Sequence, residues 1–203
     1  MKTTWTKESL IQFENRVADT FNQGKIKAPV HLHNNNEDQL IEIFEKIAEQ
    51  DWVLSSWRSH YHCLLKGVPE EELFQDILLG KSISLAFSNY RVLCSGIVTG
   101  ILPISLGIAL DIKRQGGNEK VWCFIGDMTA ETGMAHECIK YAQNFDLPVT
   151  YVVEDNGKSV CTDTKKTWGM KESSFVNGAD KVLYYSYDLS KYPHAGAGKR
   201  VQF

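Results

Sequence analysis

The sequence lacks the features that would point to a membrane, a nucleic acid or an oxidising compartment. It has no run of 18 apolar residues, and its first stretch, MKTTWTKESL, lacks the apolar core of a signal peptide, so we expect no membrane association. The net charge is −3 without a long block of like charge, which gives no support for nucleic-acid binding. The five cysteines are scattered and form no CxxC pair, so we expect reduced thiols in a cytoplasmic protein.

The order of apolar segments predicts an α/β fold. KVWCFIGD (120–127) and LPVTYVVED (147–155) are typical of buried strands, and 129–146 between them is typical of a helix. This strand–helix–strand unit implies a parallel sheet with helices on both faces. We expect one domain over 1–203, with a helical N-terminal extension (1–30) and a C-terminal tail (189–203). Further helices are expected over 7–23, 34–50, 69–80 and 103–117, and another strand over 181–188.

Polar residues follow the two predicted strands at the points where they end. GDMTAETG places Asp127 after the first strand, and DNG places Asn156 after the second. Because parallel strands end at one edge of a sheet, both side chains should face one crevice, together with the N-terminus of the helix that begins near Thr129. Carboxylate, amide and carbonyl oxygens suit Mg²⁺, and a helix N-terminus suits phosphate. The pattern predicts a metal-diphosphate site; the simpler alternative is a helix cap followed by an ordinary turn.

Several stretches resemble a known family. GDMTAETG and the later EDNG are similar to the thiamine diphosphate motif, GDG followed by NN at a comparable spacing. HECIKYAQNFDLPVTYVVEDNG, WRSHYHCLLKG (57–67) and SGIVTGILPISLGIAL (95–110) resemble segments of the alpha chain of the 2-oxoacid dehydrogenase decarboxylase. These motifs occur in register over about residues 50–169. The resemblance implies a thiamine-diphosphate-binding fold, with stand-alone diphosphate-binding subunits as the most similar members.

The resemblance assigns roles to individual residues. The side chains of Asp127 and Asn156 and the backbone carbonyl of Lys158 match the ligands of Mg²⁺. The carbonyl of Gly96 matches the group that holds the 4′-amino group of thiamine diphosphate, and Val98 matches the apolar wedge that bends it. The residues that match the diphosphate-binding part are Arg58, Gly126, Met128 and Thr129.

The chain also departs from the family pattern. Met128 replaces the second glycine of GDG, which is tolerable if its φ is negative. Trp57 replaces a tyrosine whose hydroxyl helps to hold phosphate, Ser84 stands where the family has a histidine, and Asp155 replaces the first asparagine of NN. The departures at Trp57, Ser84 and Met128 support an alternative function, that of a degenerate scaffold subunit.

The histidines need separate consideration. Two HxH pairs, His31/His33 and His60/His62, could bind zinc, but no cysteine or acid completes a ligand set at the usual spacing. His60 lies two residues after Arg58 and could contact cofactor or substrate. His194, in the tail KYPHAGAGKRVQF, is a second catalytic candidate that could relay protons near the substrate, with Lys199 or Arg200 near an anionic group.

The resemblance implies that the site is completed by a partner. In the family, the glutamate that activates thiamine diphosphate lies in a pyrimidine-binding domain, and this chain carries motifs of the diphosphate-binding domain alone. We therefore expect a beta-type subunit that supplies that domain and its glutamate, in an α₂β₂ assembly that acts on a small-molecule substrate. The leading hypothesis is the diphosphate-binding subunit of an enzyme that decarboxylates a 2-oxo acid and transfers the resulting unit. The alternatives are the N-terminal half of a split transketolase and the scaffold subunit.

Overall fold

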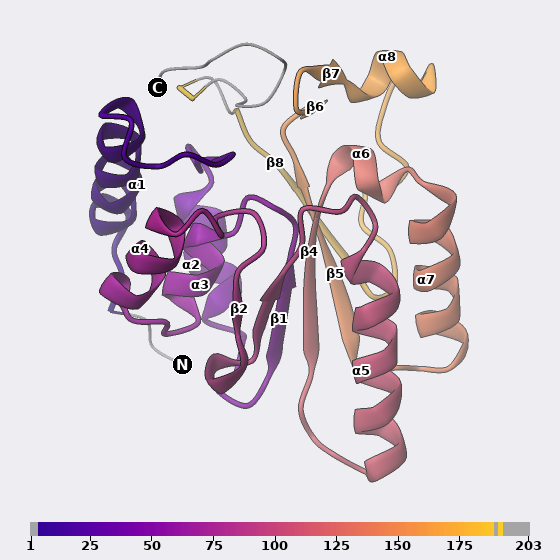
Figure 1. Cartoon of the computed structure of the whole chain (residues 1–203). Coiled ribbons are helices and arrows are strands. Elements are labelled where there is room, and N and C mark those ends of the chain that lie inside the picture. The colour runs from indigo at the N-terminus through magenta and orange to yellow at the C-terminus, as the bar shows by residue number, and fades with distance from the viewer. Residues whose placement is uncertain (1–3, 189–190, 193–203) are drawn as a thin grey trace.

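A six-stranded sheet between two layers of helices forms the centre of the protein (Figure 1). The structure is a computed structural model that describes residues 4–188 and 191–192. The strand order is β2-β3-β1-β4-β5-β8, and all neighbours are parallel except β2 and β3. The strands are β1 (Trp52–Ser55), β2 (Ala86–Phe87), β3 (Val92–Cys94), β4 (Val121–Gly126), β5 (Val149–Asp155) and β8 (Val182–Ser186). The predicted α/β fold with a parallel sheet is confirmed.

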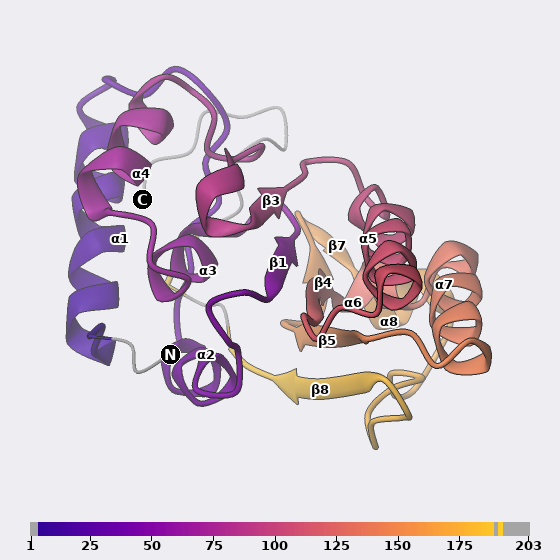
Figure 2. The ribbon, with the colours of Figure 1, turned by 90° about the horizontal axis from the view of Figure 1, so that it is seen from below.

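The helices divide between the two faces of the sheet (Figures 1 and 2). One face carries α1 (Lys7–Asn22), α2 (Glu37–Phe44), α3 (His60–Leu65) and α4 (Glu70–Leu78), whereas the other carries α5 (Ile101–Gln115) and α7 (Gly133–Asn144). The short helices α6 (Asp127–Ala130) and α8 (Thr164–Trp168) and the hairpin of β6 (Lys158–Ser159) and β7 (Thr162–Asp163) lie beyond one end of the strands. A single 3-10 turn, η1 (Ser88–Tyr90), precedes β3.

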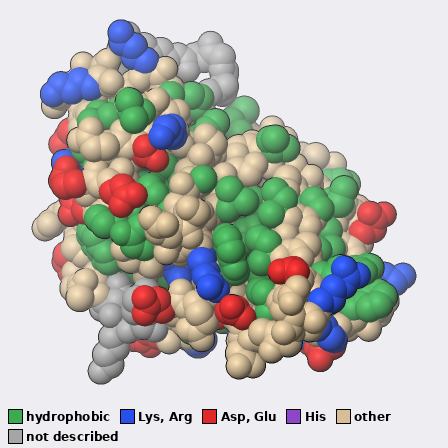
Figure 3. Space-filling model, turned by 60° about the horizontal axis from the view of Figure 1, so that its bottom comes forward, with side chains coloured by type: hydrophobic (Ala, Val, Ile, Leu, Met, Phe, Trp, Pro, Cys, Tyr) green, Lys and Arg blue, Asp and Glu red, His purple; other side chains and the backbone are tan. Residues whose placement is uncertain are grey.

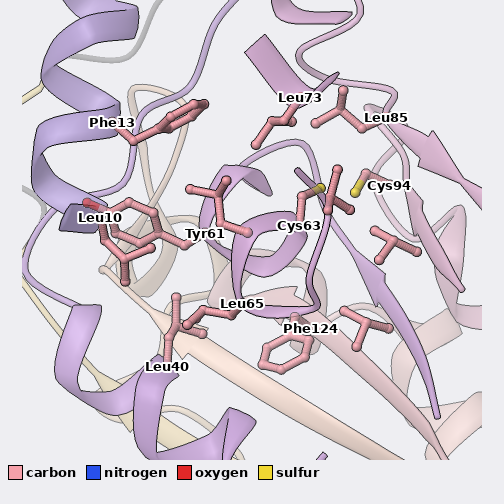
Figure 4. Packing of buried hydrophobic residues seen from close by; sticks show 14 of the residues in the cluster. Leu10, Phe13, Leu40, Tyr61, Cys63, Leu65, Leu73, Leu85, Cys94 and Phe124 are labelled. Atoms are coloured by element: carbon pink, nitrogen blue, oxygen red, sulfur yellow. The ribbon is translucent and has the colours of Figure 1, made fainter. Parts of the chain in front are cut away.

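Two hydrophobic clusters pack the two helix layers against the sheet. In β4, Trp122 and Phe124 point into one cluster and Cys123 and Ile125 into the other, because successive side chains of a strand face opposite sides. This explains why the strand is apolar throughout rather than alternating. The first cluster, shown in Figure 4, combines residues of α1 to α4 with the sheet, among them Leu10, Phe13, Leu40, Tyr61, Leu65 and Leu73. The segment 1–30 thus contributes to the core through α1.

Most predicted elements are present, with differences at their ends. The helix expected over 129–146 is divided into α6 and α7, because the Thr132 hydroxyl accepts a hydrogen bond from the N–H of Ala135 and starts a new helix. The helix expected over 34–50 is shorter, since α2 ends at Phe44. The sequence analysis did not identify β1, β3 or α3, whose three to six residues are too short for a clear pattern.

The expectations of reduced cysteines and of no membrane segment can be compared with the structure. All five cysteines are free, and four of them are buried. Within residues 4–188 and 191–192, the structure has no helix with the length and apolar character needed to cross a membrane.

Candidate functional site

A hollow lies across the carboxyl ends of β1, β4, β5 and β8. From β1 the chain continues to β2 and β3 on one side of it, and from β3 it crosses to β4 on the other side. Such a reversal of strand order is a switch point, where open α/β sheets bind ligands. Six residues assigned from the sequence line this hollow: Arg58, Gly126, Met128, Thr129, Asn156 and Lys158. The other described lining residues are Ser56, Trp57, Glu154, Ser159 and Tyr187.

Asp127 is buried next to the hollow. It is the first residue of α6 and is 2% exposed, and neither of its carboxylate oxygens has a hydrogen-bond partner among the described residues. Burial raises the pKa of Asp127 to about 6. Gly126 is the N-cap of α6 and no side chain caps this helix, so capping does not explain the acid. A buried carboxylate without partners is costly unless a cation or proton compensates it.

Asn156 is held at the end of β5 by a tight turn. Its Oδ1 accepts the N–H of Lys158 at 3.1 Å, and its Nδ2 donates to the hydroxyl of Tyr187 at 3.1 Å. Gly157 has a φ of +75°, a conformation that favours glycine, which explains the DNG sequence. The turn directs the amide toward the hollow from the strand next to β4.

The available donor atoms suit a hard cation. The carboxylate of Asp127 and the amide of Asn156 lie at the ends of the neighbouring strands β4 and β5, and oxygen donors of this kind are the ligands that Mg²⁺ prefers. Among the residues described, no group of three or more histidines, cysteines or acids is arranged to hold a metal. The HxH pairs therefore do not assemble a zinc site in the described part of the chain, and the fit of the hollow to Mg²⁺ rests on the oxygen donors of Asp127 and Asn156.

Arg58 presents its guanidinium to the hollow. Its side chain is buried, and its Nε donates to the carbonyl of Leu32 at 2.8 Å. Its two terminal nitrogens make no hydrogen bond to any residue that the structure describes. A planar guanidinium held in this way is well suited to bind an oxyanion with its free N–H groups.

Trp57 occupies the wall of the hollow beside Arg58. Its indole nitrogen is buried and has no hydrogen-bond partner within the described residues, and its ring lies 5.9 Å from the ring of His31 between centroids. The resemblance places a tyrosine hydroxyl at this position. The indole N–H offers a donor there, so replacement by tryptophan does not remove hydrogen-bonding capacity from the wall.

Met128 fits the backbone where the family has glycine. It lies within α6 and is not among the residues with positive φ, so the backbone here can accept methionine in place of glycine. Its sulfur accepts a hydrogen bond from the indole N–H of Trp168 at 3.2 Å. This contact joins α6, at the hollow, to α8.

We expect Met128→Gly to lower stability while leaving diphosphate affinity nearly unchanged. Glycine in a helix costs about 1 kcal/mol, and the contact with Trp168 is lost, but the backbone at this position needs no glycine. Thermal unfolding and calorimetric titration with inorganic diphosphate and Mg²⁺ measure both effects. Clearly tighter binding by the glycine variant would show instead that the methionine obstructs the hollow.

The segment that follows β3 is exposed. Ile97 and Val98 are 73% and 43% exposed, and neither they nor Gly96 line the hollow. A Cβ on Gly96 would lie 3.1 Å from the end of the Ile83 side chain, so a larger residue here would require that side chain to shift by a few tenths of an ångström. Thr99 has a φ of +67°, an unusual conformation for a β-branched residue. The two residues assigned to the thiamine part of the cofactor are thus placed at an open edge.

His60 lies in the interior. Its Nδ1 is 2.9 Å from Oε2 of Glu14, and its Nε2 is 2.9 Å from Oγ of Ser82. The three side chains have the order of a hydrolase triad, but all are fully buried, so no substrate can reach the serine. His60 is absent from the described lining of the hollow, and its position favours an indirect role. The other catalytic candidate, His194, lies outside the described residues, as do Lys199 and Arg200.

The remaining HxH residues are also buried. Burial lowers the pKa of His33 well below its usual value, and His62 and Arg58 nearby lower it further, so His33 is neutral. Nε2 of His62 lies 3.3 Å from a carboxylate oxygen of Glu154. The structure places His31, His33, His60 and His62 in the interior, where the chain before β1 and helix α3 pack together.

Two polar lining residues were not identified from the sequence. Glu154 stands in the VVEDNG stretch, and its carboxylate accepts the hydroxyl of Tyr185. Tyr187 follows β8, and its hydroxyl accepts a hydrogen bond from Nδ2 of Asn156. Both residues stand at or just after the end of a strand. The same position pointed to Asp127 and Asn156 and could have identified these two as well.

Comparisons with known proteins agree with this geometry. The family model described as "Dehydrogenase E1 component" matches residues 6–184. The chain is 28% identical over 174 residues to the alpha subunit of acetoin:2,6-dichlorophenolindophenol oxidoreductase of Bacillus subtilis, covering 79% of this chain and 52% of that protein. It is 31% identical over 163 residues to the pyruvate dehydrogenase E1 component subunit alpha of Porphyra purpurea, covering 71% and 47% respectively. The chain thus spans about half the length of the curated relatives that it matches.

Proposed function

The chain belongs to the dehydrogenase E1 component family, and from this premise we propose that it is the diphosphate-binding subunit of a two-subunit thiamine-diphosphate enzyme that acts on a 2-oxo acid. The observation that carries the proposal is the buried, unpartnered carboxylate of Asp127, placed beside a hollow that Arg58 and Asn156 also reach. A scaffold would have no need to retain this costly arrangement.

Each residue of the hollow has a task in this proposal. Asp127, Asn156 and the backbone carbonyl of Lys158 hold Mg²⁺, and Arg58 binds the diphosphate together with backbone N–H groups near Met128 and Thr129. The carbonyl of Gly96 and the side chain of Val98, at the open edge after β3, would contact the thiamine portion. Bound thiamine diphosphate supplies the carbon nucleophile that allows a 2-oxo acid to lose carbon dioxide. The protein orients the cofactor and excludes water from it.

The proposal includes a partner. Hydrophobic side chains are exposed at Ile97 and Val98 and along α5 and α7, at Ile104, Met134 and Phe145. Figure 3 shows hydrophobic side chains gathered on the face of the protein seen from below. Such surfaces are typical of protein interfaces. We propose that a beta-type subunit covers part of this surface and brings the pyrimidine-binding domain and its glutamate, within an α₂β₂ enzyme of the cytoplasm.

The alternatives have less support. A split transketolase would also use a metal-diphosphate site, but the family model and both named relatives are of the dehydrogenase type. A degenerate scaffold rests on the substitutions at Trp57, Met128 and Ser84. The first keeps a free donor and the second fits its backbone, so neither removes the site.

Arg58→Ala tests the diphosphate site directly. We expect the affinity for inorganic diphosphate in the presence of Mg²⁺ to fall about 10- to 100-fold, because hydrogen bonds to charged groups contribute about 1.5–3 kcal/mol. Calorimetric titration of the full chain measures this loss. Arg16→Ala is the control, because Arg16 pairs with Glu70 and Glu71 and does not line the hollow. Equal binding by the Arg58 variant and the wild-type chain would contradict the proposal.

A further inference from the structure

Glu14 is a buried acid whose function is not explained by the hollow itself. It lies on α1, is fully buried and is absent from the described lining of the hollow. Its Oε1 accepts the backbone N–H of His33 at 2.9 Å, and its Oε2 lies 2.9 Å from Nδ1 of His60. Burying a carboxylate is costly, so these contacts must compensate for the lost hydration.

One peptide unit joins Glu14 to Arg58. The N–H of His33 and the carbonyl of Leu32 belong to the same planar peptide. Glu14 accepts from its N–H end at 2.9 Å, and Nε of Arg58 donates to its carbonyl end at 2.8 Å. A negative group at the N–H and a positive group at the carbonyl polarise the peptide in the same sense, so each hydrogen bond strengthens the other.

Both ends of this connection are fixed. His60 holds the second oxygen of Glu14, and Ser82 lies 2.9 Å from the other ring nitrogen of His60, so the carboxylate cannot rotate freely. At the opposite end, the bond to Leu32 occupies Nε of Arg58 and sets the plane of the guanidinium. The terminal nitrogens of Arg58 then remain for an anion in the hollow, and little side-chain entropy is lost on binding.

We propose that Glu14 is a positioning residue for anion binding: it acts through the Leu32–His33 peptide and orients the guanidinium of Arg58. The inference rests on the proposed function of the hollow as a diphosphate site. It gives α1 a part in that function, and it gives His60 the task of holding Glu14. The simpler account, in which Glu14 only stabilises the fold, predicts no specific effect on Arg58.

The test compares Glu14→Gln with Glu37→Gln in the full chain. Glu37 is also a buried glutamate with two contacts, to the hydroxyl of Tyr61 and the N–H of Asn35, each 3.1 Å, but these do not lead to Arg58. Two quantities are measured: the dissociation constant for inorganic diphosphate with Mg²⁺, and the NMR resonance of the Arg58 Nε–H group, assigned by its absence in Arg58→Ala.

We expect Glu14→Gln to shift the Arg58 Nε–H resonance and to weaken diphosphate binding roughly tenfold, the loss of one charge-assisted contact. In an Arg58→Ala background, Glu14→Gln should weaken binding no further. Glu37→Gln should lower the melting temperature while leaving both quantities unchanged. If Glu14→Gln does not fold, Glu14→Asp keeps the charge but shortens the side chain, and the same shift and loss are expected.

The outcomes separate this inference from the proposed function. If Arg58→Ala weakens binding but folded Glu14 variants change neither quantity, the inference is overturned. If Glu14→Gln weakens diphosphate binding equally in the wild-type and Arg58→Ala backgrounds, the role of Glu14 is purely structural and the inference is also overturned. If the wild-type chain and Arg58→Ala have the same affinity for diphosphate, the proposed function fails. The Arg58 resonance still reports in that case on the connection to Glu14.

Discussion

We expect replacement of Asp127 by alanine to abolish Mg²⁺-dependent diphosphate binding without unfolding the chain. The carboxylate is a proposed metal ligand, and loss of a ligand should exceed the roughly 10- to 100-fold effects of residues that merely support ligands. The fold should persist, because the oxygens of Asp127 make no hydrogen bond within the described structure that alanine would break. Calorimetric titration with Mg²⁺ and inorganic diphosphate measures the binding, and circular dichroism measures the fold.

Asp155→Asn is the matched control for this prediction. Asp155 is buried at the end of β5, but one of its oxygens accepts the N–H of Gly157 and the other accepts the hydroxyl of Tyr184. An amide oxygen can retain a contact in that turn, so binding should change little. Undiminished binding by Asp127→Ala would refute the assignment of Asp127 as a metal ligand.

The pH dependence of stability gives a second readout of Asp127. Burial raises its pKa to about 6 in the metal-free protein, compared with about 3.9 in an unfolded chain. The folded state therefore binds more protons than the unfolded state between about pH 4 and 6, and stability falls as the pH rises through this range, by about 3 kcal/mol. Denaturant titrations in EDTA at both ends of the range should show this loss for wild type, and Asp127→Asn should lack it. Identical curves for the two proteins would contradict the assigned pKa.

Purified by itself, the chain should show no decarboxylation of a 2-oxo acid, even with Mg²⁺ and thiamine diphosphate. The residues assigned to the thiamine portion, Gly96 and Val98, are exposed, and we attribute the activating glutamate to a partner. Proton transfer by a positioned side chain contributes about 10²- to 10⁴-fold, so turnover should appear only on assembly. Without the partner, the exposed apolar surface should favour self-association, which analytical ultracentrifugation detects.

The partner to add is a beta-type subunit, to be sought in the neighbouring reading frame. Decarboxylase activity on mixing, lost when the glutamate of that subunit is replaced by alanine, is the expected result. Activity with a ketose donor instead would favour the split transketolase, and an inactive but stable complex would favour the scaffold. Robust turnover by the chain alone would refute the two-subunit proposal.

The sequence was most informative about features that depend on residues close together along the chain. β4 and β5 are apolar runs that end in polar turns, and their parallel pairing follows from the helical segment between them. The position of Asp127 and Asn156 at neighbouring strand ends could therefore be predicted from periodicity alone. Arg58 had no such local signal, and its assignment depended on the resemblance of the WRSH segment to a family.

The sequence by itself determined the α/β class and the acid and amide at the strand ends, because these depend on patterns within 37 residues, from 120 to 156. Only the tertiary structure decided that the HxH histidines lie in the interior rather than at the hollow, and what holds Arg58. Glu14, His33 and Arg58 are 19 and 25 positions apart in sequence, and they meet because α1 packs on the layer that carries α3. Contacts of this range arise from the burial of apolar faces, and no local pattern in the sequence records which polar groups that burial brings together.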